Sequence, residues 1–180
     1  ITNARVSFPH LFTRPIIKGN EGKCGASLML EPAKHKDVLS NVRKGIAALV
    51  TEKLKGKKLP PEKYCLRDGE DKGREEYEGF QILSANSKKR PLVIGDDGNS
   101  VVSSEDDNRI YAGCFVNAKV RLWAQDNDYG KRINAELIAI QFASDGPPLD
   151  GSYVSEADAV EGFVGVEQAS NDFLDNDDDF

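Results

Sequence analysis

Hydrophobic and polar residues alternate along several short segments of the chain, and one longer segment has a helical spacing instead. Alternation at residues 4–9 and 23–30, interrupted by Pro and Gly residues, predicts two opening strands. Between residues 35 and 55, apolar residues recur every three or four positions, which predicts an amphipathic helix. This helix packs its apolar stripe on a sheet or, as the alternative, presents it to a partner.

Strand patterns resume in the second half of the chain. They cover residues 77–87, 91–94 and 101–102, followed by two longer stretches at 110–125 and 131–143 that a turn at 126–130 connects. A Gly-Pro-Pro sequence at 146–148 marks the end of this pattern. We therefore expect a mainly β domain over residues 1–150 with one inserted helix, and a disordered acidic tail over residues 151–180.

Charge divides the 180-residue chain into two unequal parts. Residues 1–132 contain all 24 Lys and Arg residues and 18 of the 30 Asp and Glu residues, which gives a formal charge of +6. Residues 133–180 contain the other 12 acidic residues, and the whole chain therefore carries −6. A basic body attracts a polyanion such as nucleic acid, and a tethered acidic tail can compete for the same surface.

Composition also narrows the cellular context and the kind of site. Three cysteines without a Cys-x-x-Cys pair argue against a disulfide framework and a structural zinc site, and they suit a reducing cytoplasm. No apolar run approaches the length of a membrane span. We therefore expect a soluble cytoplasmic protein without a membrane partner.

The segment 115–125 carries the chemistry most relevant to function. If it is a strand, small and aliphatic residues form one face, whereas the other presents Phe115, Asn117, Lys119, Arg121, Trp123 and Gln125. Exposed rings beside cations suit single-stranded nucleic acid, because a base stacks on the ring while the cations hold phosphates. The alternative is that Trp123 packs under a loop and that Lys119 and Arg121 are merely solvated.

Other segments repeat the combination of rings and cations. Tyr129, Lys131 and Arg132 occupy the following hairpin, and Lys88, Lys89 and Arg90 follow another predicted strand. Tyr77, Phe80 and Tyr111 are further stacking candidates, with packing in the core or under loops as the alternative for each.

The C-terminus is a second candidate binding element. Asp175, Asp177, Asp178 and Asp179 precede a terminal Phe180. Such a run can simply keep a protein soluble. A bulky ring beside a free carboxylate and several acids is also a compact ligand for a basic, apolar pocket on a partner.

We find no residue pattern that predicts catalysis. Asp68, Glu70 and Asp71, or Asp96 and Asp97, could bind a divalent cation as in a nuclease, but solvation of loops is the better explanation. Residues 19–23 are too short for a phosphate-binding loop. We expect no enzyme activity, no cofactor and no metal.

The chain resembles the phage-encoded single-stranded-DNA-binding proteins with an OB fold, a family formerly described as a domain of unknown function. The segments 6–12, 66–70, 85–91 and 110–118 carry the resemblance. The tail separately resembles the acidic, Phe-ended tails of bacterial and phage single-strand binders. Together these resemblances imply an OB Greek-key barrel of about five main strands, a role in DNA replication, recombination and repair, and recruitment of polymerase or helicase by the tail. Because residues 68–71 are acidic here, Arg67 is the one residue of its motif that we place near phosphate.

These patterns together predict a sequence-independent single-stranded-DNA-binding protein. Phage origin, and with it action in the host cytoplasm, is what the resemblance implies. The alternative from another class is an acidic DNA mimic that inhibits a host nucleic-acid enzyme, and a metal-dependent nuclease is a third. A mimic should distribute acids over its folded body, whereas here they concentrate near the C-terminus. Self-association is left open.

Overall fold

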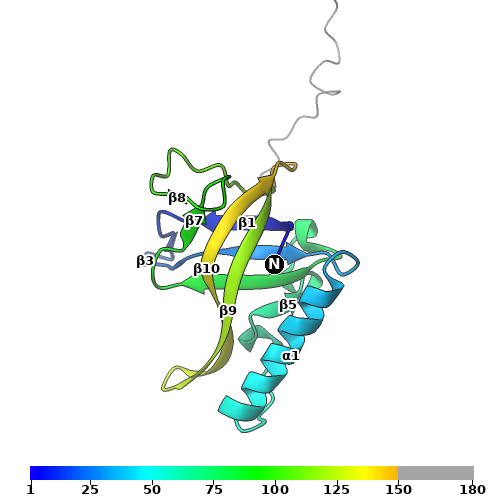
Figure 1. Ribbon diagram of the computed structural model, residues 1–180. Helices are drawn as coiled ribbons and strands as arrows, with labels where there is room; N and C mark the ends of the chain where they lie inside the picture. The colour runs from blue at the N-terminus through cyan, green and yellow to red at the C-terminus, as the bar shows by residue number, and fades with distance from the viewer. Residues whose placement is uncertain (150–180) are drawn as a thin grey trace, which may run out of the picture.

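Five long strands close into a barrel in the computed structural model, which describes residues 1–149. They are β1 (Ala4–His10), β4 (Cys24–Leu30), β6 (Gln81–Ser87), β9 (Phe115–Asn127) and β10 (Gly130–Ser144) (Figure 1). Strand β1 lies between β4 and β9, and parallel pairing of β6 with β10 at Ala85 and Ala135 completes the circuit. This strand order is that of an OB Greek-key barrel, so the predicted fold class is confirmed.

Shorter elements connect and extend the barrel. They are the strands β2 (Ile16–Ile17), β3 (Asn20–Glu21), β5 (Leu66–Asp68), β7 (Leu92–Ile94) and β8 (Val101–Val102), and the 3-10 helices η1 (Pro61–Lys63), η2 (Glu70–Lys72) and η3 (Glu75–Tyr77). Strand β5 adds to β6, while β7 pairs in parallel with β10. The predicted acidic tail over residues 151–180 lies outside the described residues, so the domain boundary at residue 150 stays a prediction.

The predicted helix is α1 (Lys36–Lys53), which lies along the outside of the barrel next to β9 and β10 (Figure 1). Leu39 and Val42 on its apolar stripe are buried in the same core as the strands, which is the packing role that the spacing predicts. A Cβ atom on Gly45 would come within 2.9 Å of the Leu122 side chain, so glycine allows α1 to approach β9 closely.

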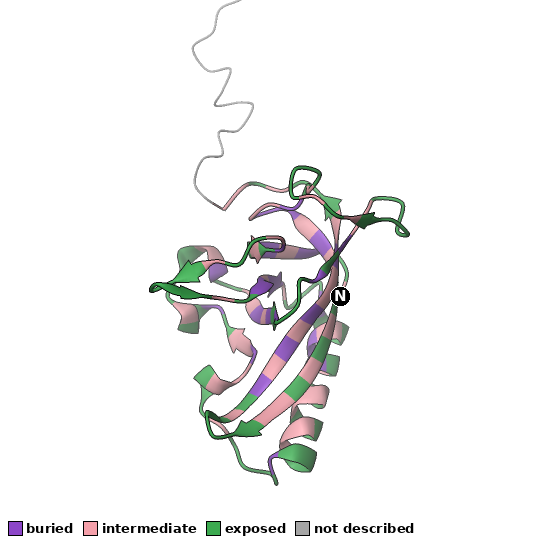
Figure 2. Ribbon diagram, turned by 90° about the vertical axis from the view of Figure 1, so that its left-hand side faces the viewer, coloured by how far each residue is buried: buried purple, intermediate pink, exposed green. Residues whose placement is uncertain are grey.

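The core fills the barrel and the space under α1. Buried aliphatic residues come from every long strand, among them Val6, Leu28, Leu83, Val116 and Leu137. Figure 2 shows buried residues along the barrel strands, whereas the tip of the β9–β10 hairpin is exposed. The barrel is therefore packed with side chains, and ligands have access only to its outer surface.

Two predicted strands begin later than their patterns suggested. The segment expected to start at residue 110 becomes a strand only at Phe115, because Gly113 turns the chain with φ +113°. The segment expected from residue 77 starts at Gln81, because Gly79 has φ +77° at the end of η3. In both positions a left-handed backbone conformation, which favours glycine, interrupts the extended chain.

Candidate nucleic-acid interface

Trp123 lies between two adjacent cavities on the barrel surface. Alternation along β9 directs its side chain outward, and 37% of the residue is exposed. One cavity has a volume of about 240 Å³ and the other about 370 Å³, and both are lined by Trp123, Lys23 and Asn86. We call the two together the Trp123 groove. A partly exposed indole in a hollow can accept a flat ligand on its open face.

Six cations line this groove although they come from six different parts of the chain. They are Lys23 before β4, Arg67 on β5, Lys72 on η2, Lys88 after β6, Arg121 on β9 and Arg132 on β10. Opposing this charge, Glu62 and Glu136 also line the groove. The cations still outnumber the acids, so the groove attracts anions.

Some of this positive charge is already paired within the protein. The Arg121 guanidinium donates from both Nε and Nη2 to Oε2 of Glu136, at 3.1 and 2.6 Å. Arg132 donates from Nη2 to the backbone carbonyl of Glu62 at 3.2 Å, a contact that leaves its charge uncompensated. An anion in the groove therefore competes with Glu136 for Arg121 but not with any carboxylate for Arg132.

Arg67 and Lys72 form the most enclosed cationic pair of the groove. Lys72 is half-buried and donates from Nζ to the Ser84 hydroxyl at 2.9 Å. Burial lowers the pKa of Lys72, and repulsion by Arg67 and Arg74 lowers it further. Of the six salt bridges among residues 1–149, none involves Arg67 or Lys72.

A third cavity continues from the groove. It has a volume of about 540 Å³, shares Lys23 and Asn86 with the Trp123 groove, and is otherwise lined by mostly apolar residues that include Phe8 and Ile17. Phe8 is 44% exposed, and the Arg74 guanidinium lies 4.5 Å from its ring centre. A concave surface therefore extends from Trp123 to a second exposed ring.

Five of the residues expected to contact DNA line the groove. They are Trp123, Arg67, Lys88, Arg121 and Arg132. Lys119 is exposed on the same face of β9, four residues from Trp123, but does not line either cavity. Tyr129 is 91% exposed at the hairpin tip, where Lys131 forms an ion pair with Asp126 at 2.6 Å.

Two expected cations lie next to the groove without lining it. Lys89 and Arg90 are exposed after β6, and the Arg90 guanidinium is 4.5 Å from the ring centre of Phe12. That contact holds Arg90 against the loop that follows β1. Both residues follow Lys88, which lines the groove, so a ligand contacts them only if it extends past Lys88 and out of the groove.

The structure contradicts a stacking role for Tyr77. This residue is only 2% exposed, belongs to a core cluster with Met29 and Ile82, and donates from its hydroxyl to Ser7 at 3.1 Å. Phe80 packs half-buried against the same cluster. The sequence does not reveal that Tyr77 is buried, because a ring at the end of a 3-10 helix is not part of a strand whose alternation would fix its direction.

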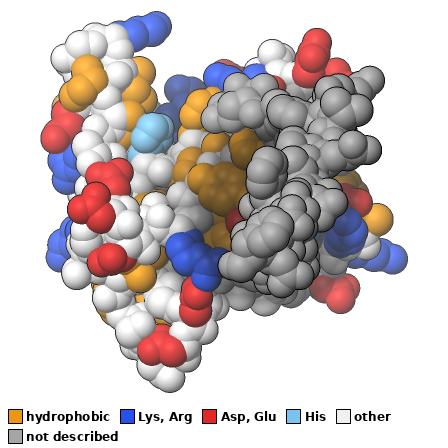
Figure 3. All heavy atoms as spheres, turned by 90° about the horizontal axis from the view of Figure 1, so that it is seen from above, with side chains coloured by type: hydrophobic (Ala, Val, Ile, Leu, Met, Phe, Trp, Pro, Cys, Tyr) orange, Lys and Arg blue, Asp and Glu red, His pale blue; other side chains and the backbone are white. Residues whose placement is uncertain are grey.

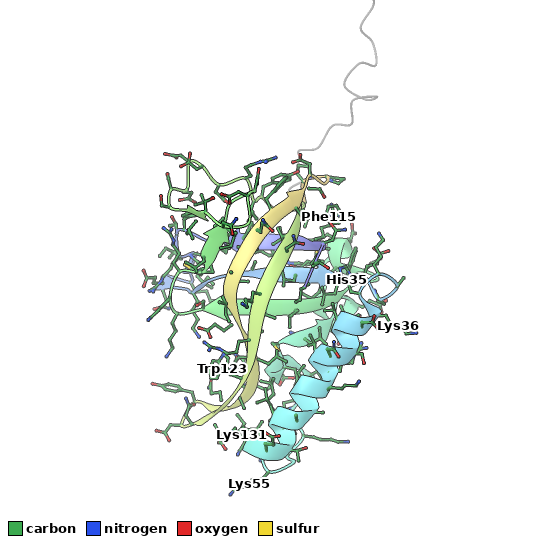
Figure 4. The ribbon with its side chains drawn as sticks, viewed as in Figure 1. His35, Lys36, Lys55, Phe115, Trp123 and Lys131 are labelled. Atoms are coloured by element: carbon green, nitrogen blue, oxygen red, sulfur yellow. The ribbon has the colours of Figure 1, made fainter. Side chains whose placement is uncertain are left out.

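Tyr111 and Phe115 are also removed from the groove. The Tyr111 hydroxyl donates to the Gly146 carbonyl at 2.8 Å, so the ring anchors the segment after β10. Phe115 is close to Gly146, and Figure 4 shows it toward the end of β9 opposite to Trp123. Both rings therefore hold the chain near residue 146.

Sequence reasoning missed Lys23, Lys72 and Asn86. Each lies in a segment whose pattern suggested only a turn, a charged loop or a strand. No local signal distinguishes these residues from other surface polar residues, since their position depends on the pairing of β4 with β6 and on the fold of the loop after β5.

Three of the carboxylates considered for a divalent cation have partners within the protein, and one of them, Asp96, forms an ion pair with Arg109. Asp97 accepts from the backbone of Asn99 and Ser100 and from the Ser100 hydroxyl, and these bonds hold the pKa of Asp97 below its usual value. Asp68 accepts from the backbone of Glu70 and the side chain of Gln81. Residues 1–149 contain no group of three or more His, Cys, Asp or Glu side chains placed to hold a metal. Within the same residues, no helix is long and apolar enough to cross a membrane.

Comparison with known proteins places the chain in a family. Residues 1–174 match the family model described as the ssDNA-binding protein of Enterobacter phage Enc34. Protein p50 of Acyrthosiphon pisum secondary endosymbiont phage 1 is 33% identical over 97% of this chain and 96% of its own length. The solved structure of the bacteriophage Enc34 single-stranded DNA-binding protein in complex with ssDNA is 30% identical, with a TM-score of 0.73, over 83% of this chain and 87% of that one. A C-terminal truncation of the same phage protein gives 29% identity and a TM-score of 0.74, over 83% of this chain and 86% of that one. This chain belongs to the phage Enc34 ssDNA-binding protein family.

Proposed function

We propose that this protein binds single-stranded DNA through the Trp123 groove without a strong preference for sequence. The observation that carries the proposal is a partly exposed indole in a hollow lined by six Lys and Arg side chains. Family membership supports it, because a relative with 30% identity was solved in complex with ssDNA. The function requires no catalytic step and no cofactor.

The chemistry of the groove favours unpaired bases over a duplex. A base can stack on the open face of Trp123 only if it has left its own stack and partner strand, and such stacking contributes about 1–3 kcal/mol per base. Cations that contact phosphates and a ring that contacts any π face carry little sequence information. Binding should therefore depend on strandedness and salt rather than on base identity.

The path of the strand follows the continuous concave surface. From Trp123, a chain of nucleotides passes Lys23 and Asn86 and reaches the cavity beside Phe8. Phe8 then offers a second stacking surface at this end of the path.

The acidic tail has a proposed regulatory and recruiting role. Asp175, Asp177, Asp178, Asp179 and Phe180 lie outside the described residues, and the formal charge of −12 over residues 133–180 supports competition with DNA for the basic body. The terminal Phe beside acids suits recruitment of a replication protein such as a polymerase or helicase. We place this activity in phage DNA replication, recombination and repair in the host cytoplasm. Deletion of residues 172–180 should tighten binding to DNA at low salt and abolish recruitment.

The rival function, acidic DNA mimicry, fits the charge distribution less well. Seen from above in Figure 3, the described part of the surface carries Lys and Arg side chains interspersed with Asp and Glu. A mimic requires a continuous array of acids that imitates phosphates.

The deciding experiment is fluorescence anisotropy of labelled oligo-dT and of a duplex, measured at several salt concentrations. We expect tighter binding to oligo-dT, with quenching of Trp123, the one tryptophan of the chain. If each of the six groove cations forms one ion pair with the DNA backbone, log affinity should fall against log salt with a slope of about −4. Preference for duplex, or absence of binding to either, would refute the proposal.

A further inference from the structure

The smaller cavity of the groove contains two buried donors that have no acceptor in the protein. Among residues 1–149, the buried side-chain atoms without a hydrogen-bond partner are Nε of Arg67 and Nδ2 of Asn134. Both residues line the 240 Å³ cavity, which we call the Arg67 pocket. Buried donors are nearly always satisfied, so these two need acceptors from outside the protein, which a water molecule or a ligand in the pocket can supply.

Local structure holds these donors and a second cation in place. Arg67 Nη2 donates to the carbonyl of Asp71 at 3.3 Å, which fixes the guanidinium against η2, the 3-10 helix that also carries Lys72. Lys72 Nζ donates to the hydroxyl of Ser84 on β6, and this hydrogen bond holds the ammonium group in place. The two cations are thus kept near each other in the same pocket without a carboxylate in ion-pair contact with either, an arrangement that their repulsion opposes.

Strand register places this pocket directly beside the stacking surface. Asn134 on β10 is the cross-strand partner of Trp123 on β9. Directly opposed residues of an antiparallel pair point to the same face, with Cβ atoms about 4.5–5.5 Å apart. A ligand that uses both side chains therefore needs a flat apolar part next to an anionic part.

We propose that the Arg67 pocket binds one backbone phosphate of single-stranded DNA and that the adjoining base stacks on Trp123. A phosphate is a pure acceptor with several lone pairs, so it satisfies the two unpartnered donors and compensates the charges of Arg67 and Lys72. A base in the pocket would bring donors of its own, and water would leave the charges uncompensated. This inference rests on the proposed function and specifies where the backbone is held.

The first test measures the salt dependence of oligo-dT binding for Arg67→Met, with Lys36→Met at the far end of α1 as the control. Loss of one phosphate contact should make the slope of log affinity against log salt about 0.7 less steep in R67M. K36M, which also loses one cation, should keep the wild-type slope. An unchanged slope in R67M would overturn the inference, even if affinity falls, because Arg67 would then affect binding without contacting a phosphate.

The second test uses Asn134, whose substitution leaves the cations in place. We expect Asn134→Asp to weaken oligo-dT binding about tenfold through repulsion of the phosphate, whereas Asn41→Asp on the exposed face of α1 should have little effect. Asn134→Leu removes a buried unpartnered donor, so it should raise the thermal midpoint of the DNA-free protein while weakening DNA binding. A raised midpoint with unchanged affinity in N134L would mean that no phosphate uses this amide.

Inorganic phosphate distinguishes a DNA site from a general anion site. At equal ionic strength, phosphate should raise the thermal midpoint of the wild-type protein more than chloride does. This difference should be clearly smaller in R67M, where only the non-specific stabilisation by a kosmotropic anion remains. If this Arg67-dependent stabilisation by phosphate is observed but the salt slope of DNA binding is the same in R67M and wild type, the pocket binds free phosphate rather than DNA, and the inference is overturned. If wild-type protein fails to bind oligo-dT, the proposed function fails separately, while the phosphate measurement still reports on the pocket.

Discussion

Replacement of Trp123 by Ala tests the central feature of the groove. The indole is the stacking surface that both cavities share, and no other aromatic residue lines them except Tyr64, whose hydroxyl accepts from the backbone of Leu59 at 3.1 Å in the described structure. The substitution removes the ring and leaves all six groove cations in place. Binding should therefore lose its stacking contribution while it keeps its electrostatic contribution.

The expected magnitude follows from the geometry of one base on one open ring. A stacking energy of about 1–3 kcal/mol per base corresponds to an affinity loss of roughly 5- to 150-fold. Only 37% of Trp123 is exposed, so the loss reaches the upper part of this range only if a base covers the whole exposed part of the ring. The slope of log affinity against log salt should stay at the wild-type value, since no phosphate contact is removed.

The assay is anisotropy of labelled oligo-dT at several salt concentrations, because W123A lacks the intrinsic fluorophore. Trp123→Phe should recover part of the loss, since a smaller ring still stacks. Val101→Ala, at a half-exposed position on β8 outside the groove, should leave affinity unchanged. Thermal unfolding checks that each variant folds. A folded W123A that binds oligo-dT as tightly as wild type would refute the reasoning.

Three further predictions concern charges and thiols. Glu136→Gln should release Arg121 and so tighten oligo-dT binding about two- to fivefold at low salt, whereas Glu52→Gln on α1 should leave the affinity unchanged. An affinity of E136Q equal to or weaker than that of wild type would contradict this. The pKa of Lys72 is lowered from its ordinary value of 10.5, so the charged form of Lys72 costs stability below the lowered pKa, and this cost disappears as the pH rises to 10.5. In urea unfolding, the stability of wild type relative to Lys72→Met should therefore rise over this pH range. A difference that does not change with pH would contradict this. Burial raises the pKa of Cys65 to about 11, so maleimide should label it at neutral pH only after unfolding, and rapid labelling of the native protein would show that the thiol is accessible.

Local patterns in the sequence determined the elements and the direction of side chains along them. The spacing at residues 35–55 predicted α1, and alternation along β9 correctly separated the buried Val116 from the exposed Trp123. Both are properties of neighbouring residues, because a helix or strand has a fixed side-chain period. The excess of positive charge before residue 133 is likewise a property of the chain itself.

The tertiary structure decided which of these side chains meet. Lys23 and Asn86 join Trp123 because β6 pairs with β4 on one side and with β10 on the other. Lys72 joins them because η2, which follows β5, brings its ammonium group to Ser84 on β6. Tyr77 is not a site residue, because η3 turns its ring into the core. Such contacts join residues far apart in the chain, and they depend on how the barrel closes. A sequence pattern reports the period of one element, whereas a groove is built by the pairing of several.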